Sequence, residues 1–257
     1  MQFHLNLLLL CFCLCVPFCD IQAQIVNIES QRIMTTNDSV SWYGRLTGTG
    51  NLTRVRKQSL LINIAGTVEY KNKRHLTLAL LNLRLIRAGQ EDFSRDAFAH
   101  LRYNYKLSKI LIWEAYTQIQ SSPIQLLQQR RLIGTGLRLR FFKSQNGRQH
   151  IHLGSSVMFE QNKFSEEPDW QGLYRSSNYF ALALRTKNQF SIVSTAYWQP
   201  VLGLIKNYRF SSESVVSIKI TRKLAFNTVF YYNIDKNLPA NAPLETYGWR
   251  NGVTWEL

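Results

Sequence analysis

Residues 130–142, RRLIGTGLRLRFF, show a pattern that recurs along this chain. Ile133 and Leu137 share one parity, whereas Arg138 and Arg140 share the other. Because successive side chains of a β-strand point to opposite faces, this segment predicts a strand with one apolar and one cationic face. Alternation alone does not decide whether the apolar face meets a protein core or lipid.

Similar alternating segments follow one another from about Val40 to the end of the chain. They predict about twelve strands and no helix, with polar or turn-forming runs between them. Asn146-Gly147 is the strongest hairpin signal among these runs. Two longer polar runs, residues 88–96 and 161–178, are predicted to be loops.

Two architectures fit such alternation: a soluble β-sandwich or lipocalin-like protein, and a transmembrane barrel. Three features favour the barrel. The predicted strands contain about ten residues or more, near the length that a tilted strand needs to cross a bilayer. Tyr and Trp recur near the ends of the apolar segments, and the last predicted strand runs to Leu257. We therefore predict an all-β fold, an antiparallel transmembrane β-barrel of about 12 strands.

The N-terminus predicts export. An apolar run at residues 7–16 and a small-residue site ending at Ala23 have the layout of a secretory signal peptide. The predicted domains are a signal peptide at 1–23 and one outer-membrane β-barrel domain at 24–257. All four cysteines lie in this leader, so the mature chain is expected to contain none. A lipoprotein anchor at Cys19 is the alternative targeting interpretation.

The formal net charge is +15, from 31 basic and 16 acidic residues. The cations are dispersed rather than gathered in a dense basic run, and an exported protein meets little nucleic acid. Nucleic acid is therefore not an expected partner. Outer-membrane lipids including lipopolysaccharide, and small anionic solutes, are the partners that this charge favours.

The arginine face gives the candidate site. A charged side chain on the lipid face near the bilayer midplane would cost about 2–4 kcal/mol, so the arginines are expected to face the lumen. The predicted lumen-lining residues are Arg130, Arg138, Arg140, Glu114 and Gln118. Arginines paired with Glu114 and Glu160 would close the lumen, whereas unpaired arginines would line an anion-selective path. Gly134 and Gly136 could make room for either arrangement or permit curvature.

Catalysis is a different interpretation, because some outer-membrane barrels are lipid hydrolases or acyltransferases. His150 and His152 share a strand face and could ligate a metal, but the sequence names no third ligand. Ser155 and Ser156 offer hydroxyl groups, yet nothing places a base beside them and no G-x-S-x-G turn is present. We predict no catalytic residues, no cofactor and no metal.

The run from residue 97 to residue 142 carries a family resemblance. Its distinctive features are His100-Leu101-Arg102-Tyr103-Asn104-Tyr105, Trp113-Glu114-Ala115 with Gln118 and Gln120, and Arg131-Leu132-x-Gly134-x-Gly136. This core resembles the salt-induced outer membrane protein family, catalogued as domain of unknown function 481. The resemblance implies an outer-membrane β-barrel of a Gram-negative bacterium and no defined activity. The chain departs from the family at Ser121-Ser122, where asparagine is expected, and at its terminal Leu257, where phenylalanine is usual.

We therefore expect a bacterial outer-membrane protein that acts in envelope integrity or in passive permeation of small solutes, anions among them. A non-channel subunit of a larger surface complex is the alternative function. A lipid-modifying barrel enzyme and a soluble periplasmic β-protein are the remaining alternatives.

Overall fold

The computed structural model describes residues 41–54, 58–88, 91–145, 148–186, 190–221 and 224–255. These residues form twelve strands of 11 to 17 residues and one short 3-10 helix, η1 (Pro123–Gln125), between β5 and β6. The strands are β1 (Ser41–Arg54), β2 (Gln58–Asn72), β3 (His75–Ala88), β4 (Glu91–Lys106), β5 (Leu111–Ser122), β6 (Leu127–Lys143), β7 (His150–Phe164), β8 (Gln171–Arg185), β9 (Phe190–Val201), β10 (Leu204–Lys219), β11 (Leu224–Asp235) and β12 (Glu245–Trp255). Within the described part of the chain, no helix is long and apolar enough to span a membrane.

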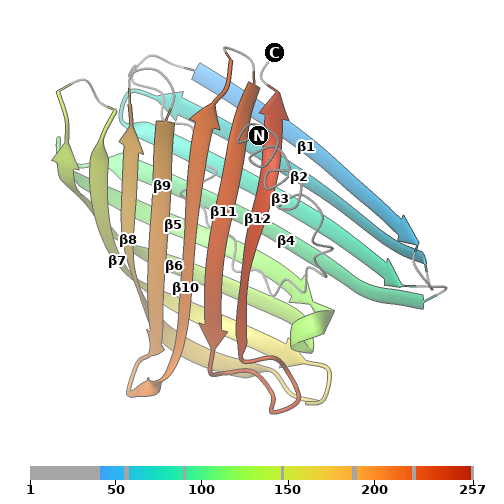
Figure 1. The fold of residues 1–257 in the computed structure, drawn as a ribbon. Helices are drawn as coiled ribbons and strands as arrows, with labels where there is room; N and C mark the ends of the chain where they lie inside the picture. The colour runs from blue at the N-terminus through green and yellow to red at the C-terminus, as the bar shows by residue number, and fades with distance from the viewer. Residues whose placement is uncertain are drawn as a thin grey trace, which may run out of the picture.

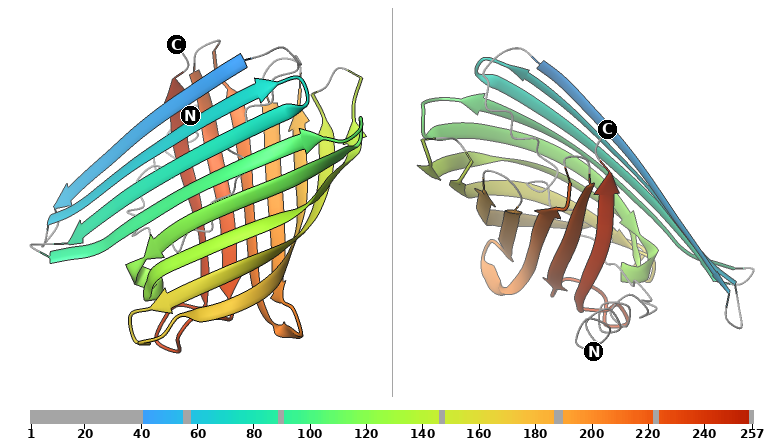
Figure 2. Two further views of the ribbon diagram at one scale, coloured as in Figure 1. Left: turned by 180° about the vertical axis from the view of Figure 1, so that it is seen from behind. Right: turned by 45° about the horizontal axis from the view of Figure 1, so that its top comes forward.

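Each strand pairs antiparallel with the next, so the sheet order is the chain order from β1 to β12. The sheet curls on itself, with β9–β12 in front of β1–β6 and crossing them at a steep angle (Figures 1 and 2). The predicted all-β fold of about twelve antiparallel strands is confirmed. Because the number of strands is even, β1 begins and β12 ends at the same end of the sheet. We call this the terminal end, and the opposite one the far end.

The distribution of polarity is the inverse of that in a soluble protein. On β7, buried and more exposed positions alternate, and the buried parity contains His152, Ser156 and Glu160. The other parity contains Leu153 and Val157, which are exposed. In a water-soluble sheet the apolar parity would be the buried one. This sheet therefore encloses its polar face and presents its apolar face outward.

Two segments that the sequence predicted as loops are mostly strand, so both loop predictions were wrong. Of residues 161–178, only 165–170 connect strands, because β7 continues to Phe164 and β8 begins at Gln171. Residues 88–96 similarly begin on β3 and continue along β4. The physical reason is that the enclosed face is polar. Where the outward side chains near a strand end are also polar, the sequence loses its alternation although the strand continues.

Several sequence predictions fall outside the described residues. These are the signal peptide at 1–23, the Cys19 anchor, the Asn146-Gly147 hairpin and the C-terminal Leu257.

Candidate functional site

The enclosed face of β6 contains the arginines of the opening pattern. Arg130 and Arg138 are 1% and 3% exposed, whereas Ile133 and Phe141 on the other parity are 63% and 68% exposed. Burying a charge without a partner is strongly unfavourable, so each buried arginine requires carboxylates or other acceptors nearby. The structure places these acceptors on strands β5, β7 and β11.

Five charged side chains form a network near the far end, which we call the belt: Arg130, Glu160, Arg175, Arg209 and Asp235. Arg209 donates from Nη1 and Nη2 to the two carboxylate oxygens of Glu160, at 2.9 and 3.0 Å. Its Nε donates to Asp235 Oδ2 at 2.9 Å. Arg175 Nε lies 3.4 Å from Glu160 Oε1, and Arg175 Nη1 donates to the backbone oxygen of Gln199 at 2.9 Å.

Arg130 joins the belt from the opposite wall. Its Nη2 donates to Asp235 Oδ2 at 3.2 Å, and its Nε lies 3.6 Å from Glu160 Oε1. Its Nε also donates to Asn162 Oδ1 at 2.8 Å, and Asn162 in turn donates to Glu160 at 2.8 Å. Every member of the belt is 3% exposed or less. The bidentate Arg209, Arg130 and the buried Asn162 amide thus provide donors to the two carboxylates, and buried ion pairs are tolerated when their carboxylates are hydrogen-bonded in this way.

The belt joins strands that are far apart in the sheet. Arg209 is opposite Asp235 on the neighbouring strand, so that pair follows from the register. In contrast, β10 and β7 are three strands apart, and β6 and β11 are five strands apart. Arg209–Glu160 and Arg130–Asp235 therefore meet across the enclosed space rather than along the wall. At this level the interior is filled by the side chains of opposing walls.

A second cluster lies nearer the terminal end, around Glu114. Arg102 Nη1 and Arg138 Nη1 lie 3.4 and 3.7 Å from its carboxylate oxygens. Tyr179 donates its hydroxyl proton to Glu114 Oε2 at 2.8 Å, from a strand three positions away in the sheet. The Arg102 guanidinium also lies 4.8 Å from the centre of the Tyr116 ring, a cation–π contact. We call Glu114, Arg102, Arg138 and Tyr179 the Glu114 cluster.

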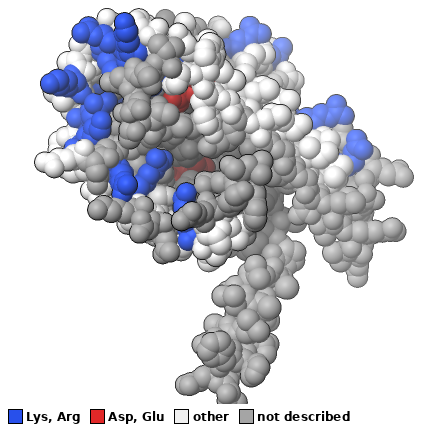
Figure 3. Space-filling model, turned by 90° about the horizontal axis from the view of Figure 1, so that it is seen from above, with Lys and Arg blue, Asp and Glu red and all other residues white. Residues whose placement is uncertain are grey.

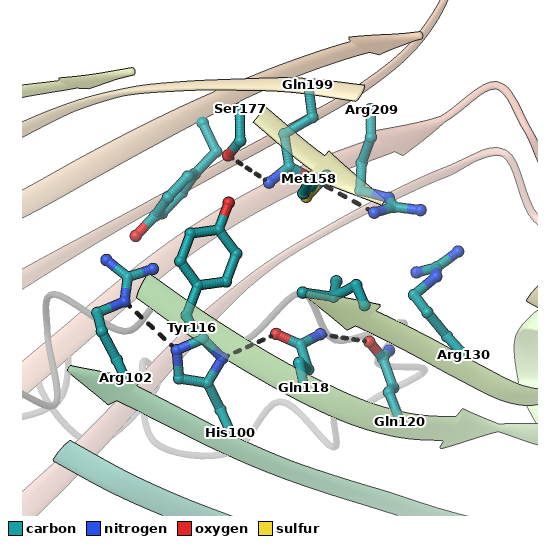
Figure 4. A pocket seen from close by; sticks show the side chains of 12 residues that line it. His100, Arg102, Tyr116, Gln118, Gln120, Arg130, Met158, Ser177, Gln199 and Arg209 are labelled. Atoms are coloured by element: carbon teal, nitrogen blue, oxygen red, sulfur yellow. Dashed lines mark hydrogen bonds between the residues drawn. The ribbon is translucent and has the colours of Figure 1, made fainter. Parts of the chain in front are cut away.

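A cavity of about 40 Å³ separates the Glu114 cluster from the belt. Side chains of β4–β6 face those of β7–β10 across it (Figure 4). Its lining includes Arg102 from the Glu114 cluster, and Arg130 and Arg209 from the belt. Because one water needs about 10–15 Å³ of such volume, the cavity has room for about three water molecules and not for a sugar-sized solute.

A chain of hydrogen bonds follows one wall of the cavity. Arg102 Nε donates to His100 Nε2 at 3.4 Å, and His100 Nδ1 lies 3.2 Å from Gln118 Oε1. Gln118 then donates to Gln120 at 3.2 Å. An imidazole that accepts at Nε2 and donates at Nδ1 is neutral, so these contacts assign the tautomer of His100.

The two glycines of β6 serve the packing of the neighbouring strands. A Cβ on Gly134 would lie 2.5 Å from the Tyr116 ring, and one on Gly136 would collide with the backbone and side chain of β7 at Ser155 and Ser156. The Tyr116 hydroxyl uses this space to reach Ser156 Oγ at 2.8 Å. The glycines therefore make room for a tyrosine and a close strand contact, and not for the arginines.

The five predicted residues lie at four places in the structure. Arg130 belongs to the belt, whereas Arg138 and Glu114 belong to the Glu114 cluster. Gln118 lines the cavity. Arg140 lies apart from both networks, at the terminal end, where its Nη1 donates to the backbone oxygen of Lys109 at 2.9 Å.

The sequence did not reveal three of the five belt residues, Arg175, Arg209 and Asp235, or the Asn162 amide that bonds to Arg130 and Glu160. Asn162 and Arg175 lie in the run that was predicted to be a loop. Continuing the alternation of β7 beyond Glu160 places Asn162 on the enclosed face, since the two residues are two positions apart. Nothing in a sequence pattern places Asp235 opposite Arg130, because that contact depends on how the sheet curls.

The residues considered for chemistry make other contacts. Ser155 donates to Asn178 at 2.8 Å, and Ser156 contacts the Tyr116 hydroxyl. The rings of His150 and His152 lie 5.1 Å apart. In the described part of the chain no group of three or more His, Cys, Asp or Glu side chains could hold a metal ion.

Comparison with known proteins gives a family match and weak structural similarities. The model of the family described as "Protein of unknown function, DUF481" matches residues 28–246. No curated protein sequence matches the chain. The NanC porin is 11% identical, with a TM-score of 0.49, over 82% of this chain and 98% of that one. The translocator domain of the autotransporter NalP from Neisseria meningitidis is 10% identical, with a TM-score of 0.39, over 85% of this chain and 87% of that one. OccK11 (OpdR) from Pseudomonas aeruginosa is 8% identical, with a TM-score of 0.34, over 82% of this chain and 78% of that one.

Proposed function

The chain belongs to the DUF481 family, and we propose that it is an outer-membrane barrel that acts in envelope integrity and whose lumen is closed by the belt. The observation that carries this proposal is the contact between Arg130 on β6 and Asp235 on β11. A wide diffusion pore would keep such opposite walls apart.

Placement in a membrane is supported by the outward face. Large apolar side chains are exposed along it, including Ile64, Leu101, Ile133 and Val157. A soluble monomer rarely exposes so many apolar residues, whereas lipid would cover them. Every strand has at least 11 residues, which is long enough for a tilted strand to cross the hydrocarbon core.

Exposed aromatic side chains lie toward both ends of the strands. Trp42 and Trp113 are near the terminal end, at the second residue of β1 and the third of β5. Tyr174 and Trp198 are near the far end, on β8 and β9. This is the arrangement of the two aromatic girdles of membrane barrels, whose rings lie at the levels of the lipid head groups.

A closed lumen favours a structural role over free diffusion. The belt fills the interior near the far end, and the Glu114 cluster occupies it nearer the terminal end. The cavity between them is too small for nutrients. A closed barrel of this kind would also suit a non-channel subunit of a surface complex.

Permeation of small anions is the second candidate function. Among the described residues, the belt combines three guanidinium groups with two carboxylates, and the Glu114 cluster combines two with one. Each level thus has an excess of positive charge, which attracts anions. This function would require the belt to open.

Conductance in planar lipid bilayers distinguishes the two candidates. The proposal predicts that the refolded wild-type barrel is silent. Steady, anion-selective steps from the wild-type protein would contradict the closed lumen and favour permeation. Glu160→Gln, which weakens the belt, is expected to introduce brief openings, and Glu166→Gln, an exposed carboxylate in the β7–β8 turn, is the matched control that should stay silent.

A further inference from the structure

Lysine and arginine side chains gather at the terminal end. We call the described stretches there, 73–74, 106–110, 140–145, 148–149, 185–186 and 218–221, the basic collar. Its nine cations are Lys73, Arg74, Lys106, Lys109, Arg140, Lys143, Arg148, Arg185 and Lys219, and these stretches contain no Asp or Glu. Seen from this end, Lys and Arg side chains gather mainly on one side of the molecule, with smaller groups on the other, and few acidic atoms are in view (Figure 3).

The far end has a different composition. Its described turns and adjoining strand ends contain both signs of charge: Glu166, Glu167, Asp169 and Glu245 with Lys163, Lys206 and Lys236. The overall charge of the chain therefore does not account for the collar. One end of the molecule is cationic, and the other is mixed.

The collar cations lie at the edge of the apolar outward face. Lys109 stands between the exposed Leu107 and Ile110. Lys143 directly follows two exposed phenylalanines, residues 141 and 142, and Lys219 stands between the exposed Ile218 and Ile220. Apolar side chains beside a lysine allow its stem to lie along hydrocarbon while the ammonium group reaches the head groups.

Local hydrogen bonds order part of this surface. The Arg140 guanidinium donates to the backbone oxygen of Lys109 at 2.9 Å, and the Arg140 amide donates to the Ile110 oxygen at 2.7 Å. These bonds fasten the β4–β5 turn to the end of β6. Lys109 and Lys143 are therefore presented from one ordered edge.

We propose that the basic collar binds the phosphate groups of anionic phospholipids in the leaflet that surrounds the terminal end. A lipid surface offers acyl chains and phosphates at adjacent depths, which matches the juxtaposition of exposed apolar and cationic side chains. An acidic protein surface would pair with the cations but would leave the exposed apolar side chains beside them uncovered. The proposal depends on the membrane placement proposed above and goes beyond it by assigning a lipid class to one end.

The test compares two triple variants of the mature chain, refolded into phosphatidylcholine vesicles with a minor fraction of phosphatidylglycerol. Lys73→Gln/Lys109→Gln/Lys143→Gln removes three collar cations, and Lys163→Gln/Lys206→Gln/Lys236→Gln removes three from the far end. Spin-labelled lipids report the association constant of phosphatidylglycerol relative to phosphatidylcholine. We expect the wild-type protein to prefer phosphatidylglycerol over phosphatidylcholine. This relative association constant should fall at least about tenfold in the collar variant and persist in the far-end variant, because each near-surface cation adds to the attraction.

High salt provides a second readout that needs no variant. The preference should largely disappear at 1 M salt, where the screening length is about 3 Å. No wild-type preference, or an equal loss in both triple variants, would overturn the proposal. Collar-dependent binding of lipopolysaccharide in place of phosphatidylglycerol would overturn the assignment of lipid class. A chain that fails to insert into the vesicles contradicts the membrane placement itself, so the two failures are distinguishable.

Discussion

Arg130 on β6 donates a hydrogen bond to Asp235 on β11 at 3.2 Å, across an interior that separates strands five positions apart in the sheet. The same carboxylate accepts from Arg209 on the neighbouring β10. Asp235 thereby links one wall to the opposite one. Side chains of opposite walls therefore meet in the interior near the far end.

Replacing Asp235 with asparagine is expected to destabilise the barrel by about 3–5 kcal/mol, because it leaves the three buried arginines of the belt with Glu160 as their one carboxylate. Urea unfolding of the refolded protein in detergent micelles, followed by tryptophan fluorescence, measures this change. Glu166→Gln removes an exposed carboxylate and should cost about 1 kcal/mol or less. Similar losses in both variants would show that Asp235 is not a buried ion-pair partner.

A double-mutant cycle tests the contact between the walls. Arg130→Met and Asp235→Asn are combined, and the coupling free energy is taken from the four unfolding curves. Residues in contact couple by about 0.5–3 kcal/mol, whereas distant residues are additive. Additivity within the experimental error would mean that β6 and β11 do not meet.

The sequence predicted the faces of the strands better than their extent. The parity of Arg138 and Glu114 placed both on the enclosed side, and adjacent strands bring them within 3.7 Å. The sequence of residues 161–178 is typical of a loop, because the inward Asn162 and Arg175 are polar and so are outward neighbours such as Lys163 and Ser176. Without an apolar face, alternation gives no signal.

Contacts between opposite walls could not be predicted for a different reason. Alternation specifies which face a side chain occupies, but not its height in the barrel or the residue facing it. Those depend on register shifts, such as the irregularity between Gln120 and Ser122, and on the curl of the whole sheet. The meeting of Arg209 with Glu160 follows from these global features.

A charged side chain on the outward face should destabilise the folded protein in a membrane. Ile133→Arg places a guanidinium on the apolar face of β6 and is expected to cost about 2–4 kcal/mol near the bilayer midplane. Equilibrium unfolding from phospholipid vesicles reports the cost, and Ile133→Val is the conservative control. Equal free energies of unfolding for the arginine and valine variants would indicate that residue 133 faces water.

Gly136→Ala should destabilise the β6–β7 contact by about 1–3 kcal/mol, because the added Cβ meets backbone atoms of Ser155 and Ser156 that cannot move aside easily. Gly44→Ala is the matched control, since a Cβ there meets nothing within 4 Å. Thermal unfolding in detergent compares the two variants. Equal midpoints would contradict the close approach of β6 and β7.

The enclosed arginines and the outward apolar face together predict that the protein resides in the outer membrane. The most direct test is to express the full-length chain in a Gram-negative host, isolate the outer membranes, and compare unboiled with boiled samples on an SDS gel. We predict that the protein fractionates with the outer membrane and that its unboiled band is shifted, because a folded barrel resists the detergent until it is heated. A soluble periplasmic protein with no shift would contradict the account, since Ile133 and Leu137 would then belong to a core and the arginines to water.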